Sequence, residues 1–394
     1  MESSPHTSAL RTDAPPLRSA VVIGGGVGGL AVALALRRAG IAVDVYERED
    51  HRQDRDTGFT IWSYAVRALL DLGIPASRLD AVGSAIQATE LRNTDGRLLE
   101  LMPLGQVSSR LGAASYDCSR GDLLAALTDA VGPEALHAGS ACMAIEQDGE
   151  RATARFSDGT AASADLLLGA DGIRSTVREA VSPGARLNHS GYLGSGGVLE
   201  FTHPLLPSGH HIELWGRRTK GGIADVGGGR ARWYVITRAP PGGPRPSRET
   251  LARHVRGWYP VLHDAIAGTP VHAIAHAEAW DLDPLPTWVD RRVALLGDAA
   301  HASTPFAAMG ACAAIEDAVA LGRLLAAGPL GDALANYQAE RKPRGEHVTR
   351  HSRTMLRVST LANPILARLR DAAFAHMPAK RIEQVTEEMA SGTG

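Results

Sequence analysis

The chain lacks several features that mark particular classes of protein. Its 394 residues include only three cysteines, at positions 118, 142 and 312. Their odd number and wide spacing argue against a disulfide framework or a cysteine metal site, and they favour a reducing, cytoplasmic compartment. Long apolar runs are missing as well, since none in the sequence approaches the roughly 18 residues that span a bilayer. We therefore expect no membrane partner.

The chain also lacks an excess of charge of one sign and any internal repeat. The formal net charge is −2, so nothing favours nucleic acid as a partner. An apolar fraction of 44% is ordinary for a globular protein, and 394 residues suffice for two or three domains. Residues 1–17 are rich in Ser, Thr and Pro without a secretory apolar core, which predicts a disordered leader.

A glycine-rich stretch near the N-terminus carries the strongest functional signal. Apolar residues 20–23 lead into Gly24-x-Gly26-x-x-Gly29, a helical pattern follows to residue 38, and a second apolar run over 41–46 ends at Glu47. This β-α-β pattern predicts dinucleotide binding: the glycines allow a tight turn, approach of a pyrophosphate and close helix packing. The helix N-terminus favours the phosphates, and Glu47 is placed to bind a ribose. The alternative is a glycine-rich turn without a ligand.

Two further strand-to-helix turns repeat this geometry later in the chain. Asp171-Gly172 follows the apolar strand 166–168, and Asp298 follows the strand 291–296. After Asp298 a proline turn presents the N-terminus of a long helix, which can hold developing negative charge. His301 in this turn is expected to pack or cap rather than to act in catalysis. Arg120 starts another helix, where a cation is unfavourable unless an anion neutralises it; either a nearby phosphate or a surface position explains it.

The region over 187–286 changes character and predicts a mainly β layer. Strands are expected over 192–201, 211–215, 222–226 and 231–237, and a helix over 249–258. Strand alternation sends Trp233 and Tyr234 to opposite faces of this layer. After residue 329 the chain reads as helical, with short helices around Pro343, Pro364 and Pro378 that could cover the core or carry a dimer contact.

The three motifs, in this order and spacing, resemble the single-component FAD-dependent aromatic hydroxylases. This family contains 4-hydroxybenzoate hydroxylase, the tetracycline-inactivating monooxygenases and the flavin-dependent urate hydroxylases. The resemblance covers about residues 18–355, including Tyr337-x-x-x-Arg341-x-Pro343-Arg344. It implies an α/β fold with a Rossmann-type FAD-binding domain over 18–185 and 287–330. A mainly β substrate layer over 186–286 would be inserted into that domain, and C-terminal helices would occupy 331–394.

The resemblance also implies roles for individual residues. Glu47 and Arg48 would bind the adenosine of FAD, Arg120 the flavin side chain or phosphates, and Asp298 the ribityl hydroxyls. Asp171 would belong to a loop that serves both FAD and the reduced nicotinamide, and the turn after Pro305 would border the isoalloxazine. The full set of expected cofactor residues is Gly24, Gly26, Val27, Gly29, Glu47, Arg48, Arg120, Asp171, Asp298, Pro305, Ala308, Gly310, Ala311 and Cys312. Substrate contacts are expected from Trp215, Lys220, Tyr234 and Phe306. No metal ligand and no catalytic side chain is assigned.

Two positions depart from the family pattern. Ala308 stands where the family often has glycine, and alanine tolerates positive φ poorly, so the loop beside the flavin is predicted to differ. Trp62-Ser63-Tyr64 replaces the W-P-N of the urate enzymes, which argues against simple transfer of their substrate.

The implied reaction needs no side-chain nucleophile, because the cofactor supplies the difficult chemistry. NADPH or NADH would reduce FAD, O₂ would give a C4a-hydroperoxide, and an electron-rich aromatic or polyketide-like molecule of secondary metabolism would take one oxygen atom. The protein would act as a monomer or homodimer. Another flavin oxidoreductase (a halogenase, reductase or amine oxidase) is the alternative, although no tryptophan has a partner two residues away, as the halogenase motif requires. A non-enzymatic FAD- or NAD-binding protein is the third reading.

Overall fold

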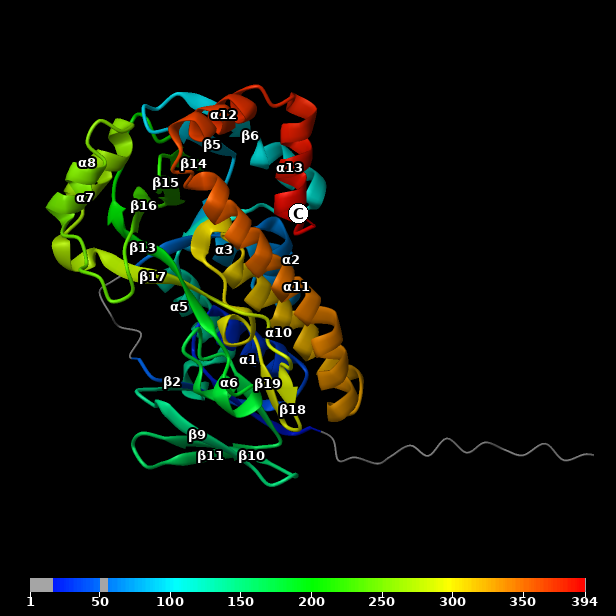
Figure 1. Cartoon of the computed structure of the whole chain (residues 1–394). Coiled ribbons are helices and arrows are strands. Elements are labelled where there is room, and N and C mark those ends of the chain that lie inside the picture. Colours follow the sequence, from blue (N-terminus) through cyan, green and yellow to red (C-terminus); the bar gives the residue numbers. More distant parts are fainter. Residues whose placement is uncertain (1–16, 50–55, 394) are drawn as a thin grey trace, which may run out of the picture.

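The computed structural model describes residues 17–49 and 56–393 of the chain. The leader predicted over residues 1–17 therefore lies outside the described residues, apart from Leu17. Figure 1 shows a lower part built on a parallel sheet and an upper part built on a second, larger sheet, with a long helix along both. Within the described ranges, no helix combines the length and the apolar character needed to cross a bilayer.

The lower part contains the β-α-β unit that the sequence predicts. Its sheet has six strands in the order β18-β19-β12-β1-β2-β8, and β1 pairs in parallel with both β2 and β12. The strands are β1 Ser19–Ile23, β2 Ala42–Glu47, β8 Leu136–Ala138, β12 Leu166–Gly169, β18 Val289–Asp290 and β19 Val293–Leu295. Because β2 and β12 flank β1 on opposite sides, the carboxyl end of β1 lies at a topological switch point, where α/β folds bind ligands.

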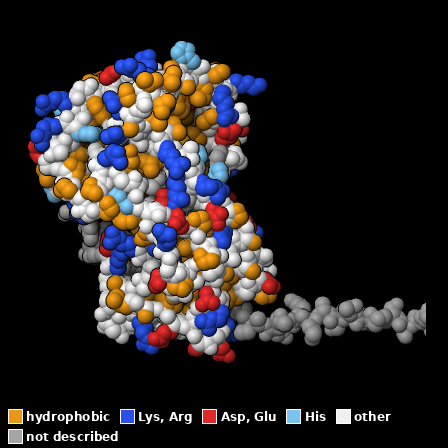
Figure 2. All heavy atoms as spheres, in the orientation of Figure 1, with side chains coloured by type: hydrophobic (Ala, Val, Ile, Leu, Met, Phe, Trp, Pro, Cys, Tyr) orange, Lys and Arg blue, Asp and Glu red, His pale blue; other side chains and the backbone are white. Residues whose placement is uncertain are grey.

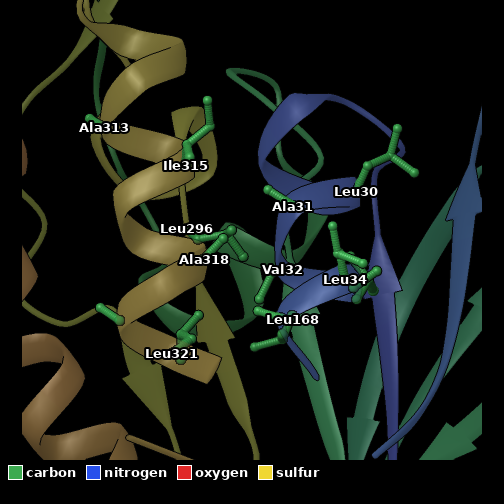
Figure 3. Packing of buried hydrophobic residues seen from close by; sticks show 14 of the residues in the cluster. Leu30, Ala31, Val32, Leu34, Leu168, Leu296, Ala313, Ile315, Ala318 and Leu321 are labelled. Atoms are coloured by element: carbon green, nitrogen blue, oxygen red, sulfur yellow. The ribbon is translucent and has the colours of Figure 1, made fainter. Parts of the chain in front are cut away.

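Helices α1 (Val27–Arg38) and α10 (Gly310–Ala327) pack against each other beside this sheet. Figure 3 shows Val32 of α1 close to Leu168 of β12 and Ala318 of α10, whereas Leu30 and Leu34 lie on the side of α1 that faces away from α10. Small residues set the spacing: a Cβ at Gly322 would lie 2.7 Å from that of Ala35. The close contact places the first turns of both helices at the same edge of the sheet.

Two small sheets and several short helices complete the lower part. One is a three-stranded antiparallel sheet of β9 Cys142–Gln147, β10 Ala152–Phe156 and β11 Ala161–Ala164. A second three-stranded sheet joins the two halves and contains β3 Gly58–Ile61, β4 Gly83–Ala85 and β7 Tyr116–Ser119. The helices here are α2 Ser63–Asp71, α3 Ala76–Val82, α4 Leu104–Leu111, α5 Arg120–Val131, η1 Pro133–Ala135, α6 Thr176–Val181, α9 Asp298–His301 and η3 Pro305–Ala307.

The upper part is a seven-stranded sheet in the order β17-β13-β16-β15-β14-β5-β6. Its strands are β5 Ala88–Asn93, β6 Leu98–Met102, β13 Leu187–Glu200, β14 His210–Trp215, β15 Lys220–Gly227, β16 Arg230–Arg238 and β17 Ala275–Leu282. Helices α7 (Arg248–His254) and α8 (Pro260–Gly268), followed by η2 (Val271–Ala273), lie on one face, where Trp233 is buried. Tyr234 faces the other way and packs in a different cluster, as strand alternation predicts.

The sequence places residues 88–102 with the first domain, but the structure pairs them with the upper sheet. These residues form the antiparallel hairpin of β5 and β6, and β5 runs parallel to β14 with Thr89 opposite His211. The local alternation reveals the hairpin, whereas its partner strand lies about 120 residues further along the chain and leaves no local signal. The helix expected over 249–258 ends earlier, at His254, and Gly257 then adopts a positive φ of 79°.

The C-terminal helices are α11 (Leu330–Ser359), α12 (Pro364–Ala375) and α13 (Ala379–Ser391). The predicted short helix around Pro343 is wrong, because Pro343 lies inside the 30-residue α11. Proline removes one helix hydrogen bond, but tertiary bonds hold α11 just before it: Tyr337 donates to the Leu295 carbonyl, and Arg341 binds Asp317. At the other end of the protein, Figure 2 shows exposed hydrophobic side chains gathered over the upper part, where α12 contributes Ile365, Leu366 and Leu369.

Candidate active site

A cavity of about 320 Å³ opens at the carboxyl ends of β1, β2 and β12. Its lining brings together the glycine-rich fingerprint, Arg120 and the Asp171 motif. It contains six of the expected cofactor residues: Gly24, Gly26, Glu47, Arg48, Arg120 and Asp171. Residues as far apart in the sequence as Gly24 and Asp171, which are separated by 147 positions, thus share one site. The parallel order of the three strands is what places their ends side by side.

The three fingerprint glycines have different local roles. Gly24 has a φ of +106°, and a Cβ there would lie 2.3 Å from the Ala170 carbonyl oxygen. A Cβ at Gly29 would lie 1.8 Å from the Gly24 oxygen, so this glycine is required for close packing of α1. Nothing lies within 4 Å of the corresponding position at Gly26, which leaves its backbone open to the cavity. The N-terminus of α1 at Val27 has no side-chain cap, so its N–H groups are available to an anion.

Charged side chains surround this open backbone. Glu47 accepts hydrogen bonds from the backbone N–H groups of Gly25 at 2.7 Å and Glu49 at 2.9 Å, one on each carboxylate oxygen. Each oxygen keeps a lone pair for a further donor such as a ribose hydroxyl. Arg48 is largely exposed beside it. The Arg120 side chain has no acidic partner within residues 17–49 and 56–393, which leaves its charge available to a phosphate.

Asp171 holds the backbone of its own loop. Its carboxylate accepts from the Ser175 hydroxyl at 2.5 Å and from the backbone N–H groups of Thr176 at 2.7 Å and Val177 at 3.2 Å, at the start of α6. Burial raises the pKa of Asp171 despite these bonds. Its role in the site is thus to fix the loop that forms the cavity wall.

Arg178 connects the second and third motifs, a role that the sequence did not suggest. Its buried guanidinium donates to the carbonyl oxygen of Ala299 at 3.2 Å and also to that of Ile173. The first bond reaches the turn of Asp298, whose side chain is open to solvent and lies beside Gly310 at the start of α10. In the sequence, Arg178 stands four residues after Arg174 in the Asp171 motif, and this proximity is the only local feature that could have pointed to its role.

The turn after Pro305 keeps the backbone that glycine would give, although Ala308 was expected to change it. Ala308 adopts φ 52° and ψ 32°, in the left-handed region. The Trp62 indole donates to the Ala308 carbonyl at 3.1 Å, and the Trp62 backbone N–H donates to the Cys312 Sγ at 3.4 Å. These two bonds hold the alanine in a conformation that costs about 1 kcal/mol. The loop therefore keeps a backbone that glycine would also adopt, and Ala311 lies in the following first turn of α10.

Three of the four expected substrate residues converge on Glu213, which sequence analysis did not select. The Glu213 carboxylate accepts from Lys220 Nζ at 3.0 Å, from the Tyr234 hydroxyl at 2.7 Å and from the Trp215 indole at 2.8 Å. The fourth, Phe306, has its ring 5.7 Å from Lys220 Nζ. A glutamate in an alternating strand looks like a solvent-face residue, so only the fold reveals this cluster.

Glycines leave room on the same face of the upper sheet. Gly222 pairs with Tyr234, and a Cβ at Gly222 would meet the Tyr234 ring at 2.7 Å. Gly196 pairs with Tyr234 from the other side, and at Gly194 the nearest atom to an added Cβ is 3.6 Å away. Trp215, by contrast, is buried against Phe374 of α12, with 5.1 Å between ring centres. The glycines thus make room for the Tyr234 ring, whereas Trp215 packs against α12.

Buried ion pairs link the two halves beside this cluster. Arg232 donates to Asp117 of β7 and, at 3.0 Å, to the Thr60 hydroxyl of β3, while His211 Nδ1 lies 3.1 Å from Asp117. Burial acts to raise the pKa of Asp117, but Arg232 and His211 outweigh burial and hold this pKa far below its usual range. His301 is likewise buried, bonds to Asp317 at 2.6 Å and stacks on Trp288, so the expected packing role is confirmed. No cluster that could hold a metal occurs in the described part of the chain.

Comparison with known proteins agrees with this geometry. The family model of the FAD binding domain matches residues 18–352. The aurachin C monooxygenase/isomerase of Stigmatella aurantiaca is 32% identical over 93% of this chain and 96% of its own length. A FAD-dependent urate hydroxylase of Mycolicibacterium vanbaalenii is 31% identical over 87% and 89%, respectively. The crystal structure of Klebsiella pneumoniae HpxO with FAD and uric acid has a TM-score of 0.87 and 28% identity, over 95% of this chain and 96% of HpxO.

The open Gly26 backbone, the uncapped α1 and the free charge of Arg120 form a cradle that fits a pyrophosphate, and Glu47 fits a ribose. This cradle agrees with the family match and with the relatives, most of whose length this chain covers, which identify the cofactor as FAD. The chain belongs to the FAD binding domain family, and it is a FAD-dependent monooxygenase.

Proposed function

We propose that this protein hydroxylates an electron-rich aromatic or polyketide-like small molecule, with NADPH or NADH as reductant and O₂ as the source of oxygen. The observation that carries the proposal is the Glu213 cluster, in which the buried Lys220 and the partly buried Tyr234 lie on one face of the upper sheet next to Phe306. Phe306 belongs to η3, which starts the turn expected to border the flavin. The polar cluster therefore lies where a ring would meet the cofactor.

FAD, once bound and reduced, supplies the oxygen-activating chemistry. The residues proposed to hold it are those of the cavity, with Asp298, Pro305 and the 308–312 turn toward the flavin. Lys220 and Tyr234 would orient the substrate by hydrogen bonds. Phe306 and Tyr192, which meet edge to face at 5.8 Å between ring centres, would exclude water from the reacting ring.

Relatives support a hydroxylase over the other flavin chemistries. Two are urate hydroxylase and aurachin C monooxygenase/isomerase, and a third, 3-amino-4-hydroxybenzoate 2-monooxygenase PtmB3 of Streptomyces platensis, is 34% identical over 90% of this chain. A cytoplasmic location suits the free thiols of Cys118, Cys142 and Cys312. A monomer or a homodimer is proposed, and size-exclusion chromatography with light scattering distinguishes them.

The test is a spectrum of the purified protein, then NADPH oxidation in air with and without a panel of phenolic and polycyclic aromatics. We expect a bound flavin, slow basal oxidation, and acceleration by a compound that gains one oxygen atom by mass spectrometry. A flavin that NADPH reduces, with a halogenated or dehydrogenated product in place of a hydroxylated one, would contradict the proposal.

A further inference from the structure

We infer that the Glu213–Lys220–Tyr234 cluster selects a neutral aromatic that carries a hydroxyl or amino hydrogen next to a carbonyl oxygen, and that it disfavours an aromatic carboxylate. The inference deepens the proposed function and rests on it, because it takes this cluster as the surface that meets the substrate.

Glu213 is an ionised carboxylate that accepts three hydrogen bonds. Oε1 accepts from Lys220 at 3.0 Å and Tyr234 at 2.7 Å, and Oε2 accepts from Trp215 at 2.8 Å. Burial acts to raise the pKa of Glu213, but the Lys220 ammonium and these bonds outweigh burial and lower the pKa to about 2. At neutral pH this group can only accept hydrogen bonds. It therefore has no proton to donate, and with three donors already bound it acts by fixing its neighbours.

The bond to Glu213 determines what Tyr234 offers to a ligand. A tyrosine hydroxyl has one hydrogen, and here Tyr234 must donate it to the carboxylate, because the carboxylate has none to give. Only the lone pairs of the phenol oxygen are left for a ligand. Tyr234 consequently accepts from a substrate O–H or N–H, and it would leave an ether oxygen at that position without a partner.

Lys220 offers hydrogen-bond donors where Tyr234 offers an acceptor, and the negative charge of Glu213 balances its positive charge. Its ammonium has three N–H donors, one of which binds Glu213, and Nζ lies 5.7 Å from the centres of both the Tyr234 and Phe306 rings. The remaining donors suit a carbonyl oxygen. Because Glu213 already balances the Lys220 charge, a substrate carboxylate would bring a second negative charge to a single buried ammonium. A neutral carbonyl has no such penalty.

The other cations of this face do not alter the charge balance. Arg232 is buried and bonded to Asp117, which His211 also contacts, so its charge is compensated. Arg238 lies at the end of β16, 5.9 Å from the centre of the Tyr192 ring, and is exposed to solvent, which screens it. The cluster thus offers one acceptor and one donor close together, in a surrounding that is neutral overall.

Three matched probes test this selection by calorimetric titration of the FAD-loaded protein. They are 2-aminobenzamide, its near-isosteric acid 2-aminobenzoate, and benzamide, which lacks the ring amino group. We expect the wild type to bind 2-aminobenzamide at least tenfold more tightly than 2-aminobenzoate. Glu213→Gln should reduce this ratio to about one or reverse it, because Lys220 then carries an unbalanced charge. An equal or tighter affinity of the wild type for the acid overturns the inference, as does an unchanged ratio in folded Glu213→Gln.

Two variants complete the test. Glu278→Gln is the matched control, since Glu278 accepts from the indole two residues later, Trp280, at 2.8 Å, as Glu213 does from Trp215. It should keep the wild-type ratio. Tyr234→Phe retains the Glu213–Lys220 pair, so the amide-to-acid ratio should persist while the advantage of 2-aminobenzamide over benzamide disappears; persistence of that advantage would contradict the role of Tyr234.

The variants are checked for flavin content and melting temperature. If Glu213→Gln loses its fold, the inference is tested by two other results. These are the wild-type affinity ratio of 2-aminobenzamide to 2-aminobenzoate and the preference of Tyr234→Phe between 2-aminobenzamide and benzamide. NADPH oxidation by the same preparations tests the proposed function separately: active enzyme with the opposite ligand preference refutes only this inference. Absence of NADPH oxidation refutes the function itself.

Discussion

The Trp62 indole N–H donates to the backbone carbonyl of Ala308, 246 residues later in the chain, at 3.1 Å. Trp62 directly follows β3 of the small sheet between the two halves, and Ala308 directly follows η3 in the turn expected beside the flavin. The bond thus connects the frame of the molecule to a backbone position that an alanine adopts only at a cost. It also explains why Ala308 does not distort the turn.

Replacing Trp62 should show how much this bond contributes. Trp62→Phe keeps an aromatic side chain in the core but removes the donor, and loss of one such bond costs about 1 kcal/mol. We expect a reduction of this size in the free energy of unfolding and weaker retention of FAD, measured by urea denaturation and by flavin release on dilution. Unchanged FAD retention in a destabilised variant would limit Trp62 to a packing role.

Ala308→Gly should act in the opposite sense. Alanine in the left-handed conformation carries a strain of about 1 kcal/mol, which glycine does not have. Glycine makes the unfolded chain more flexible, and this offsets part of the gain. We expect a net stabilisation of about 0.5 kcal/mol in urea denaturation. Ala307→Gly, one residue earlier in η3, serves as the control and should destabilise instead. A loss of stability in both variants would show that Ala308 is not strained.

Much of the cofactor site could be predicted from the sequence because its rules are local. The fingerprint from Gly24 to Glu47 lies within one β-α-β unit, and turn chemistry identifies Asp171 and Asp298 within a few residues of their strands. The proposed substrate cluster is different, because Glu213 on β14 is bonded to Lys220 on β15 and Tyr234 on β16. That pairing depends on strand register, which a single strand does not specify. For the same reason, the sequence does not show that β14 is the partner of the β5–β6 hairpin.

Asp317 gives a pH-dependent prediction in the buried core. It accepts from Arg341 at 2.8 Å, His301 at 2.6 Å and the Gly297 N–H at 3.0 Å. Burial acts to raise its pKa, but His301 and Arg341 outweigh burial and lower the pKa to about 2. The unfolded value is about 3.9. The ionised carboxylate therefore stabilises the fold above about pH 4, and this contribution declines as the pH falls toward 2.

Asp317→Asn should cost about 3 kcal/mol at pH 7, because Arg341 loses a buried counter-charge. The difference from the wild type should shrink by about 2 kcal/mol between pH 4 and pH 2, since the wild type itself loses the charge. Urea denaturation across this range measures both. Asp129→Asn, at an exposed pair with Arg78, is the control and should change stability by less than about 0.5 kcal/mol. A constant difference for Asp317→Asn would rule out the lowered pKa.

The fingerprint glycines allow fold and cofactor binding to be separated. Gly26 has φ −73° and ψ −177°, which alanine adopts freely, and an added methyl group meets no protein atom within 4 Å. Gly26→Ala should therefore leave the melting temperature of the flavin-free protein unchanged. It should still weaken FAD binding at least tenfold, because the methyl group fills the space that the pyrophosphate needs beside α1.

Gly24→Ala should behave in the opposite way, because its Cβ would lie 2.3 Å from the Ala170 carbonyl oxygen at a φ of +106°. This substitution should lower the melting temperature even without FAD. Thermal unfolding of both flavin-free variants, followed by titration with FAD, distinguishes the two effects. If Gly26→Ala bound FAD as tightly as the wild type, the pyrophosphate would have to approach the chain elsewhere, and Arg120 would lose its role in the site. Normal FAD affinity in that variant is thus the result that would most directly refute the placement of the cofactor.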